Sequence, residues 1–307
     1  MSFAPRAADV PAISRAHLWL FRRVVRSYVR RHFRAVMIEG STLLRDAAES
    51  GRPVLLYGTH ASWWDPMAAV LLGDRLMPTR RHYAPMDAVP LRRFGILRRC
   101  GVFPVDRTES TRGHSFLRTA EAILSDNGDG CGVLWITPQG RFADVRERPL
   151  RFRPGLAMLA RRLAEHSSEA VCLPLAAEFA FWDERLPEMC LRVGHAIDLR
   201  AHAALDTSAW NTLLESSLER TMDALRDDVM TRDPLSFDLL MEGARGTGGI
   251  YAWSKKLRGL WRGRAFAEER SARDAREMER TEIRREQERA RQEQVGLRQE
   301  SPRRESA

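Results

Sequence analysis

Lysine is almost absent from this 307-residue chain, whose positive charge is carried by arginine. Of its 50 basic residues only Lys255 and Lys256 are lysines, and 41 acidic residues leave a formal net charge of +9. The guanidinium group binds planar anions such as phosphate through paired hydrogen bonds. The basic excess therefore indicates an anionic partner, and two classes fit: nucleic acid or an anionic membrane surface.

Cysteine is also scarce, and its placement excludes a disulfide scaffold. The four cysteines show neither close pairing nor the spacing of metal ligands; they are Cys100, Cys131, Cys172 and Cys190. Cys131 and Cys172 lie in or beside apolar strands, so we expect buried thiols. The histidines are scattered without paired spacing, so we expect no bound metal. These features suit the reducing cytoplasm.

Long apolar runs and a signal-peptide pattern are absent as well. No run of about 18 apolar residues occurs, so we expect no segment that spans a bilayer. The hydrophobic content of 44% is nevertheless that of an ordinary globular core. A chain of this length holds one α/β domain of about 200–240 residues together with appendages.

The segment at residues 57–66, YGTHASWWDP, places a histidine five positions before an aspartate. It follows the buried-strand pattern of Val54–Leu56 and precedes a helical pattern that begins near Met67. Five residues turn a regular helix by about 500°, which leaves two side chains about 140° apart. His60 and Asp65 can therefore meet only if His60 lies in the strand-to-helix turn and Asp65 at the start of the helix.

Local chemistry favours that arrangement. Asp65 suits the N-cap position, and Pro66 suits the first helical position, where its missing N–H costs nothing. An imidazole held by a carboxylate at the end of a strand is suited to act as a general base. The alternative is structural: Asp65 is then only a helix cap, and His60 only a turn residue.

Three further segments follow in a fixed order, each at or just after an apolar strand pattern. They are Gly101–Arg107 (GVFPVDR), Thr137–Arg141 (TPQGR) and Val171–Leu175 (VCLPL). With His60 and Asp65 they resemble the four sequence blocks of the glycerolipid (lysophospholipid) acyltransferase superfamily, the family of the 1-acylglycerol-3-phosphate acyltransferases. The resemblance covers about residues 40–200, and four blocks in order make it specific. The run FRPG at 152–155 resembles the family's usual entry into the next helix.

The resemblance implies transfer of a fatty acyl group from acyl-CoA or acyl carrier protein to a hydroxyl of a lysophospholipid, a glycerol-phosphate-like molecule or another lipid. His60 would take the hydroxyl proton, while Asp65 would fix the imidazole tautomer and stabilise the imidazolium. The thioester is already activated, so no cofactor or metal is implied beyond the acyl donor. Backbone amides near Gly140 are the expected donors to the tetrahedral oxyanion.

Arg107 and Arg141, with Gln139 and Gly140, correspond to family positions that hold the acceptor's phosphate. Arginine suits that role because its planar fork forms two hydrogen bonds to phosphate oxygens. The third block departs from the family pattern: Gln139 stands where a glutamate is common, and Arg141 follows Gly140 directly, without the usual Thr-Arg-Ser run. We therefore expect an acceptor other than plain lysophosphatidic acid.

Residues 13–37 predict a basic amphipathic helix. Apolar and basic side chains recur in it at helical spacing: Leu18, Phe21, Val25 and Tyr28 among Arg22, Arg23, Arg26, Arg30 and Arg31. Such a helix suits a membrane interface, where aromatic rings lie at headgroup depth and arginines meet anionic lipid. The alternative is that its apolar face packs on the domain core, and both can hold together.

A second stretch, IYAWSKKLRGLWR at 250–262, alternates aromatic with basic side chains after a glycine-rich break. Stacking of its tryptophans on bases is the alternative to membrane contact, but no nucleic-acid-binding motif accompanies it. We therefore expect a peripheral protein at the cytoplasmic, inner face of a membrane. Its expected partners are the acyl donor, a lipid acceptor and an anionic membrane surface, without nucleic acid.

Strand and helix patterns alternate along the chain as in an α/β protein. The expected strands are 54–57, 81–86, 102–105, 132–136, 171–179 and 189–193, and the expected helices after the first motif include 112–124, 154–166 and 207–230. We expect a mixed, largely parallel central sheet flanked by helices. His60, Arg107 and residues 139–141 then follow the carboxyl ends of strands, where α/β sheets bind ligands.

The composition divides the chain into four expected regions. They are an N-terminal amphipathic helical segment (1–40), the acyltransferase α/β domain (41–240), a glycine-rich linker with the aromatic and basic segment (241–263), and a charged tail (264–307). The tail is rich in Arg, Glu and Gln and is either a solvated helix or disordered.

Two other functions remain open. One is a lipid-binding protein that keeps the fold without turnover, and the replacement of an acid by Gln139 favours it. The other is a thioester hydrolase, in which His60 activates water instead of an acceptor hydroxyl.

Overall fold

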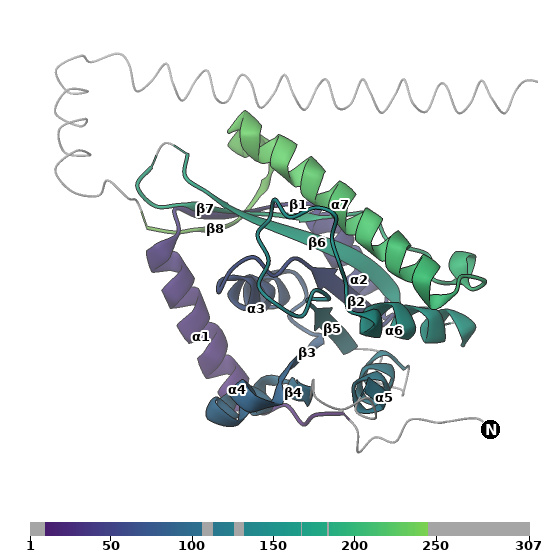
Figure 1. Ribbon diagram of the computed structural model, residues 1–307. Helices are drawn as coiled ribbons and strands as arrows, with labels where there is room; N and C mark the ends of the chain where they lie inside the picture. Colours follow the sequence, from purple (N-terminus) through teal and green to yellow (C-terminus); the bar gives the residue numbers. More distant parts are fainter. Residues whose placement is uncertain (1–9, 106–112, 126–131, 167, 183, 245–307) are drawn as a thin grey trace, which may run out of the picture. The chain divides into compact units, whose positions relative to one another are not determined.

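The computed structural model describes residues 10–105, 113–125, 132–166, 168–182 and 184–244 (Figure 1). The chain divides into two units, Met1–Gly246 and Thr247–Ala307, and all of the described residues belong to the first. The segment at 250–262 and the tail at 264–307 lie outside the described residues, so what we expect of them stays a prediction.

The described residues form one eight-stranded sheet with the order β4-β3-β5-β2-β6-β7-β1-β8. Its strands are β1 (Ala35–Glu39), β2 (Val54–Gly58), β3 (Arg81–Asp87), β4 (Val102–Val105), β5 (Gly132–Ile136), β6 (Val171–Ala180), β7 (Glu188–Val193) and β8 (Asp238–Glu242). The strands from β4 to β6 in this order are parallel. β7 is antiparallel to β6, β1 is parallel to β7, and β8 is antiparallel to β1. The expected mixed, largely parallel sheet is confirmed.

Helices cover both faces of this sheet (Figure 1). Among the described residues, the α-helices are α1 (Arg15–His32), α2 (Ser41–Glu49), α3 (Asp65–Leu76), α4 (Ala88–Arg93), α5 (Gly113–Leu124), α6 (Pro154–Glu165) and α7 (Thr207–Thr231), and the short 3₁₀ helices are η2 (Gly95–Cys100), η3 (Arg200–His202) and η4 (Pro234–Ser236). One apolar core contains buried side chains of α1, α2 and α3. The other contains those of α5, α6 and α7.

β2, the strand that leads to His60, is buried along its whole length. Leu55 and Tyr57 belong to the core under α5–α7, whereas Val54 and Leu56 belong to the core under α1–α3. This alternation follows from the two-residue period of a strand. Burial on both faces explains why β2 reads as a continuous apolar run.

Two strands and one helix were not expected from the sequence. β1 falls within residues 1–40, where we expected only a helical segment, and β8 crosses the expected boundary at residue 240. The sheet therefore extends beyond both ends of the expected 41–240 domain. β1 and α2 are short and directly follow an amphipathic helix, so periodicity alone does not separate them from it.

β6 continues through Pro174, although a proline lacks the N–H that a strand donates to its neighbour. The carbonyl of Pro174 accepts a hydrogen bond from the N–H of Gly194 at 2.9 Å, just after β7 ends at Val193. The missing N–H of the proline therefore removes a bond at the end of the β6–β7 ladder and not one in its middle.

Candidate active site

The imidazole of His60 and the carboxylate of Asp65 are in contact. His60 lies in the turn after β2, Asp65 is the first residue of α3, and Nδ1 of the histidine lies 3.1 Å from Oδ2 of the aspartate. A carboxylate accepts hydrogen bonds, so Nδ1 carries a proton, and in the neutral imidazole Nε2 then has the lone pair. This is the tautomer that a general base requires.

Asp65 also holds the turn that carries His60. Its Oδ2 accepts a second hydrogen bond from the backbone N–H of Ser62 at 2.8 Å. The carboxylate therefore points back into the turn, and Trp64 occupies the N-cap position without a side-chain cap bond. The prediction that Asp65 caps the helix is wrong, although Pro66 lies in the first turn as expected.

The His60–Asp65 pair is largely removed from solvent. The side chain of His60 is 20% exposed and that of Asp65 is 8% exposed. Phe142 covers the imidazole, with 4.2 Å between ring centroids and 31° between ring planes. The N–H of Ala143 donates to the carbonyl of His60 at 3.0 Å, which ties this covering loop to the turn.

His60 and Asp65 line a cavity of about 510 Å³ whose wall is mainly apolar. The cavity lies on the α1–α3 side of the sheet, because Leu56 and Trp135 from that face line it. α1, α3, β3 and η2 supply much of the rest of the wall, which includes Phe21. The volume is in the range of small-molecule sites, and the wall suits an apolar group that reaches inward from His60.

His82 marks the inner end of the cavity along the strands. In the sheet register it is level with Val133, which is paired with Val54. Val54 precedes Gly58 by four residues, so His82 lies about 13 Å below the end of β2 at 3.3 Å per residue.

His82 is neutral and firmly held. Its Nδ1 accepts a hydrogen bond from the indole N–H of Trp135 at 3.1 Å, and its Nε2 donates to the carbonyl of Met77 at 3.0 Å. Burial, together with the charges of Arg22 and Arg80, lowers the pKa of His82 to about 4, although the hydrogen bond to Met77 acts in the opposite direction. His82 is therefore uncharged, and the polar groups of His82 and Trp135 are satisfied by hydrogen bonds.

The third sequence block lies beside the first, because β5 and β2 are neighbouring parallel strands. Gln139 is buried, and Gly140 adopts φ +63° in the turn after β5. The N–H of Gly140 donates to the carbonyl of Thr137 at 3.1 Å. This amide closes the turn, which leaves other amides near Gly140 as the candidates for an oxyanion.

Two arginines lie beside this turn and differ in their partners. Arg141 forms an ion pair with Glu147 and donates to the carbonyl of Phe142 at 3.2 Å. Arg153, which precedes α6, lies over Gly140: a Cβ there would be 2.6 Å from the Arg153 Nε. Among the described residues the Arg153 side chain has no ion pair or hydrogen bond. Arg153 is therefore the arginine with unused donors at this turn.

Arg107 lies outside the described residues, so its role stays a prediction. The strand before it, β4, lies at the edge of the sheet and three places from β2, a separation of about 14 Å at 4.8 Å per strand. Because β2, β3, β4 and β5 are parallel, their carboxyl ends share one edge. The first and third blocks thus lie together, and the second follows a strand farther along that edge.

Sequence reasoning missed Phe142, Arg153 and His82 as residues of the site. Two of them carried a signal, since Phe142 directly follows the third block and Arg153 lies in the run at 152–155. His82 carried none, because one polar residue within a strand does not reveal that a cavity lies beside it.

Residues 35–178 match the family described as Acyltransferase, and this span contains all four sequence blocks. No curated protein matches the chain.

Proposed function

Because residues 35–178 are an acyltransferase domain of the glycerolipid acyltransferase superfamily, we propose that this acyl-transferring enzyme esterifies a lipid hydroxyl with a fatty acyl group from a thioester donor. The observation that carries the proposal is the position of His60. Its Nδ1 is held by Asp65, and both residues line the apolar cavity.

In the proposed reaction, the acceptor hydroxyl approaches Nε2 of His60 and gives up its proton as its oxygen attacks the thioester carbonyl carbon. Asp65 stabilises the imidazolium that forms. The tetrahedral intermediate then collapses, the carbon–sulfur bond breaks, and the thiolate takes the proton from His60. The products are an ester and a free thiol. A thioester is already activated, so the reaction requires no bound cofactor or metal.

The cavity of about 510 Å³ is the proposed site of the acyl chain. Its wall is largely apolar, so a buried chain gains about 0.8 kcal/mol for each CH₂ group removed from water. With the chain in the cavity, the thioester carbonyl comes to the end where His60 lies. The donor is acyl-CoA or acyl carrier protein, which present the same thioester.

The acceptor's phosphate is proposed to lie at the turn after β5. Arg153 lies over Gly140 with unused donors, and Arg141 lies beside it. Arginine binds phosphate through paired hydrogen bonds, so Arg153 joins Arg107 and Arg141 as a candidate for this contact. Gln139 is uncharged where related enzymes often carry glutamate, which supports an acceptor other than lysophosphatidic acid.

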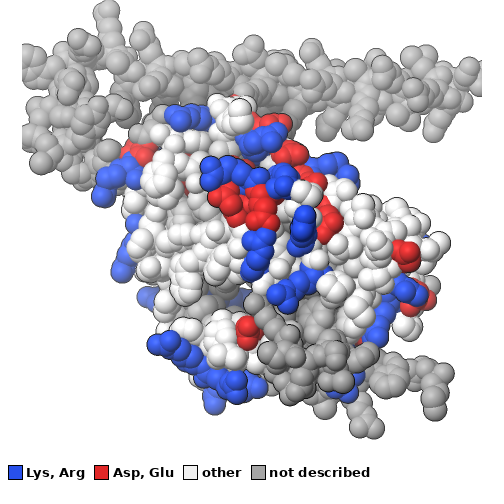
Figure 2. All heavy atoms as spheres, in the orientation of Figure 1, with Lys and Arg blue, Asp and Glu red and all other residues white. Residues whose placement is uncertain are grey.

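A membrane surface is the proposed place of the reaction. None of the described helices is both long and apolar enough to cross a bilayer. Large apolar side chains are nevertheless exposed on α1 and around the cavity, namely Trp19, Leu20, Val24, Trp63, Phe94 and Ile96. Three of these, Trp63, Phe94 and Ile96, also line the cavity. Exposed apolar side chains beside the arginines of α1 are typical of an interfacial surface. On the face that Figure 2 shows, basic and acidic side chains are interleaved in the upper middle, and basic side chains gather at the lower left.

The experiment that tests the proposal is thiol release from a set of acyl-CoA donors, with and without a lipid extract as acceptor, followed by mass spectrometry of the products. The wild type is compared with His60→Ala and with His195→Ala, a matched change at an exposed histidine. Loss of the general base is expected to lower acceptor-dependent release by about 10²–10⁴-fold. His195→Ala is expected to keep wild-type activity.

Three outcomes decide between the functions. Acceptor-dependent release that His60→Ala abolishes supports acyl transfer, and the mass gain identifies the acceptor. Release that is unchanged by any acceptor points to thioester hydrolysis. No release from acyl-CoA or from acyl carrier protein, with lipid binding retained, contradicts turnover.

A further inference from the structure

A second hollow, separate from His60, lies beside the first half of α1. It measures about 480 Å³ and is bounded by the first half of α1 and by the segment that leads into β3. Leu18 and Arg22 form part of its wall and also part of the wall of the apolar cavity, so the two spaces are separated by α1. Neither the family match nor the proposed reaction assigns it a role.

Arginine dominates the wall of this hollow. Six arginines and a single carboxylate, that of Asp74, line it; the arginines are Arg15, Arg22, Arg23, Arg26, Arg80 and Arg81. Asp74 pairs with Arg26 and lies 3.7 Å from Arg22. One carboxylate cannot neutralise the four arginines that α1 contributes, so the hollow keeps a positive potential that favours a bound anion.

The arginines of the hollow have different roles. Arg80 is buried and donates to the backbone carbonyls of Ala47, at 2.8 Å, and Arg52, so it contributes charge while it supports the fold. Arg15 and Arg23 are exposed, and the guanidinium of Arg23 lies 6.0 Å from the ring centre of Trp19. Arg15 and Arg23 therefore have donors to offer a ligand, while Arg80 and Asp74 fix the wall.

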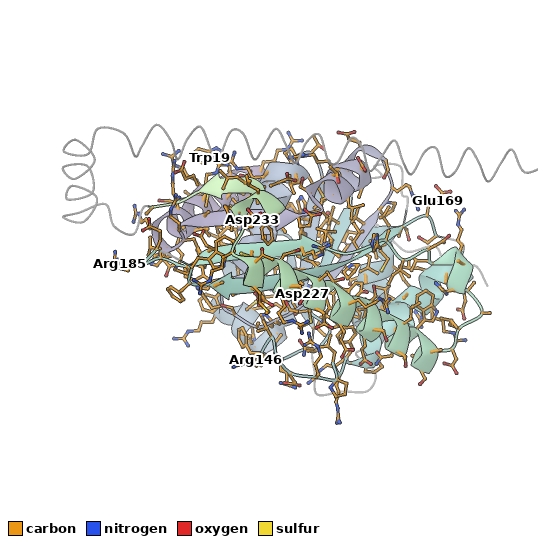
Figure 3. The ribbon with its side chains drawn as sticks, turned by 90° about the horizontal axis from the view of Figure 1, so that it is seen from above. Trp19, Arg146, Glu169, Arg185, Asp227 and Asp233 are labelled. Atoms are coloured by element: carbon orange, nitrogen blue, oxygen red, sulfur yellow. The ribbon has the colours of Figure 1, made fainter. Side chains whose placement is uncertain are left out.

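Helix α1 presents this hollow and an apolar stripe side by side. Residues four apart lie on the same side of a helix, and Leu20, Val24 and Tyr28 form an exposed stripe of this kind. Trp19, 65% exposed, lines the hollow next to that stripe, and Figure 3 shows it on the opposite side of the sheet from Arg146. Tryptophan at the border of apolar and basic surface is typical of headgroup depth.

We propose that the hollow binds the phosphate group of an anionic phospholipid in the membrane, which anchors α1 while the apolar stripe enters the lipid surface. The proposal rests on the membrane association proposed above and assigns it a specific site. Arginine forks suit phosphate oxygens. Because α1 also forms a wall of the apolar cavity, a lipid held there would keep the exposed mouth of that cavity on the bilayer.

The test is sedimentation of the full chain with vesicles of phosphatidylcholine alone and of phosphatidylcholine mixed with phosphatidylglycerol. The double variant Arg15→Gln/Arg23→Gln removes two arginines that line the hollow. The control Arg30→Gln/Arg31→Gln removes two exposed arginines of the same helix that do not line it. Both lose the same charge, so general attraction to the surface, about 1 kcal/mol per basic residue, weakens equally.

The hollow variant is expected to bind phosphatidylglycerol vesicles at least about ten-fold more weakly than the control, the scale of one lost charged hydrogen-bond contact. Equal binding by the two variants would overturn the proposal while leaving membrane association intact. If the wild type itself does not bind anionic vesicles, the membrane part of the proposed function fails as well.

A soluble phosphate source is tested in a second arm. The KM for acyl-CoA is measured with acceptor in detergent, where no bilayer is present. The hollow variant is expected to keep the wild-type KM and kcat, because His60 and the apolar cavity are unchanged. A raised KM for acyl-CoA, together with vesicle binding equal to that of the control, would show that the hollow holds the donor's phosphates and would overturn the lipid assignment.

Discussion

The imidazole of His82 and the indole of Trp135 are hydrogen-bonded at the inner end of the apolar cavity, with Nε1 donating to Nδ1 over 3.1 Å. The other imidazole nitrogen, Nε2, donates a hydrogen bond to the carbonyl of Met77. The ring also packs against Gly73 of α3, where a Cβ would lie 2.9 Å from Cε1. The depth of the cavity is therefore set by side chains that have little freedom to move.

A larger side chain between His60 and His82 is expected to shorten the usable cavity. Ala84 lines the cavity two residues beyond His82 on β3. The substitution Ala84→Phe fills part of that depth, so kcat/KM for long-chain donors falls while that for short-chain donors is kept. Competition between two acyl-CoA lengths in one reaction measures the ratio directly. An unchanged ratio in a folded variant would contradict the assignment of this cavity to the acyl chain.

The stability of the protein is expected to depend on the protonation of His82. The pKa of His82 is about 4 in the folded chain, below its ordinary value of about 6.5. Between these pH values the unfolded state binds more protons, so this group makes stability fall as the pH drops from about 6.5 to 4. Between these two pH values, the contribution of His82 to the free energy of unfolding changes by up to about 1.4 kcal/mol per pH unit.

Urea unfolding at pH 7 and pH 5, for the wild type and His82→Gln, isolates this contribution. Burial raises the pKa of Glu188 to about 6. Glu188 acts in the opposite direction, because on acidification it binds a proton at a higher pH in the folded protein than in the unfolded protein. The difference between the two proteins cancels that contribution. We expect the wild type to lose about 1–2 kcal/mol more than His82→Gln on acidification. An equal loss would mean that His82 is not held neutral.

The sequence predicts the central strands well because each is a short apolar run between turn residues. β2, β4 and β5 were predicted nearly to the residue, and the contact of His60 with Asp65 followed from the spacing of the two residues and the pattern around them. Both depend on local chemistry that a single segment contains. The same locality explains the correct prediction of α7, whose apolar side recurs at helical spacing.

The parts that were missed depend on contacts between distant segments. β1 is a strand because β7, far along the chain, pairs with it. Asp65 fails to cap α3 because its carboxylate is used by Ser62 and His60. The position of Arg153 over Gly140 requires the loop before α6 to return to the end of β5, and its backbone N–H does donate to Pro138 at 2.9 Å. The hydrophobic periodicity of a single segment does not indicate such a contact between distant segments.

Removing the charge of Asp65 is expected to weaken its stabilisation of the His60 imidazolium. In Asp65→Asn, an amide oxygen at the position of Oδ2 can still accept from the N–H of Ser62 and from Nδ1 of His60, so the turn is kept. The neutral amide does not stabilise the positive charge that His60 acquires when it takes the acceptor's proton. Activity is expected to fall by about 10²–10⁴-fold, with a melting temperature close to that of the wild type.

The same substitution at Asp74, a carboxylate in the wall of the arginine hollow, serves as a control for the loss of an acid. Asp74→Asn is expected to leave turnover in detergent close to that of the wild type. A fall in activity as large as that of Asp65→Asn would show that the effect of Asp65 is not specific to His60.

Arg153 and Arg141 provide a matched test of which arginine contacts the acceptor's phosphate. Arg153 lies over Gly140 with unused donors, while Arg141 is engaged by Glu147. A lost charged hydrogen bond is worth about 1.5–3 kcal/mol, so Arg153→Gln is expected to raise the KM for a phosphate-bearing acceptor by about 10–100-fold. Arg141→Gln is expected to change it by less than about five-fold, because Glu147 already engages this arginine and an exposed ionic contact contributes at most about 1 kcal/mol.

Steady-state kinetics with the acyl donor at saturation separates these effects from donor binding. Neither variant is expected to change the KM for the donor, since neither arginine lines the acyl cavity. An acceptor without phosphate should be used equally well by the wild type and by Arg153→Gln. If Arg141→Gln instead shows the larger change, the ion pair with Glu147 opens when the acceptor binds, and Arg141 becomes the residue that holds its phosphate.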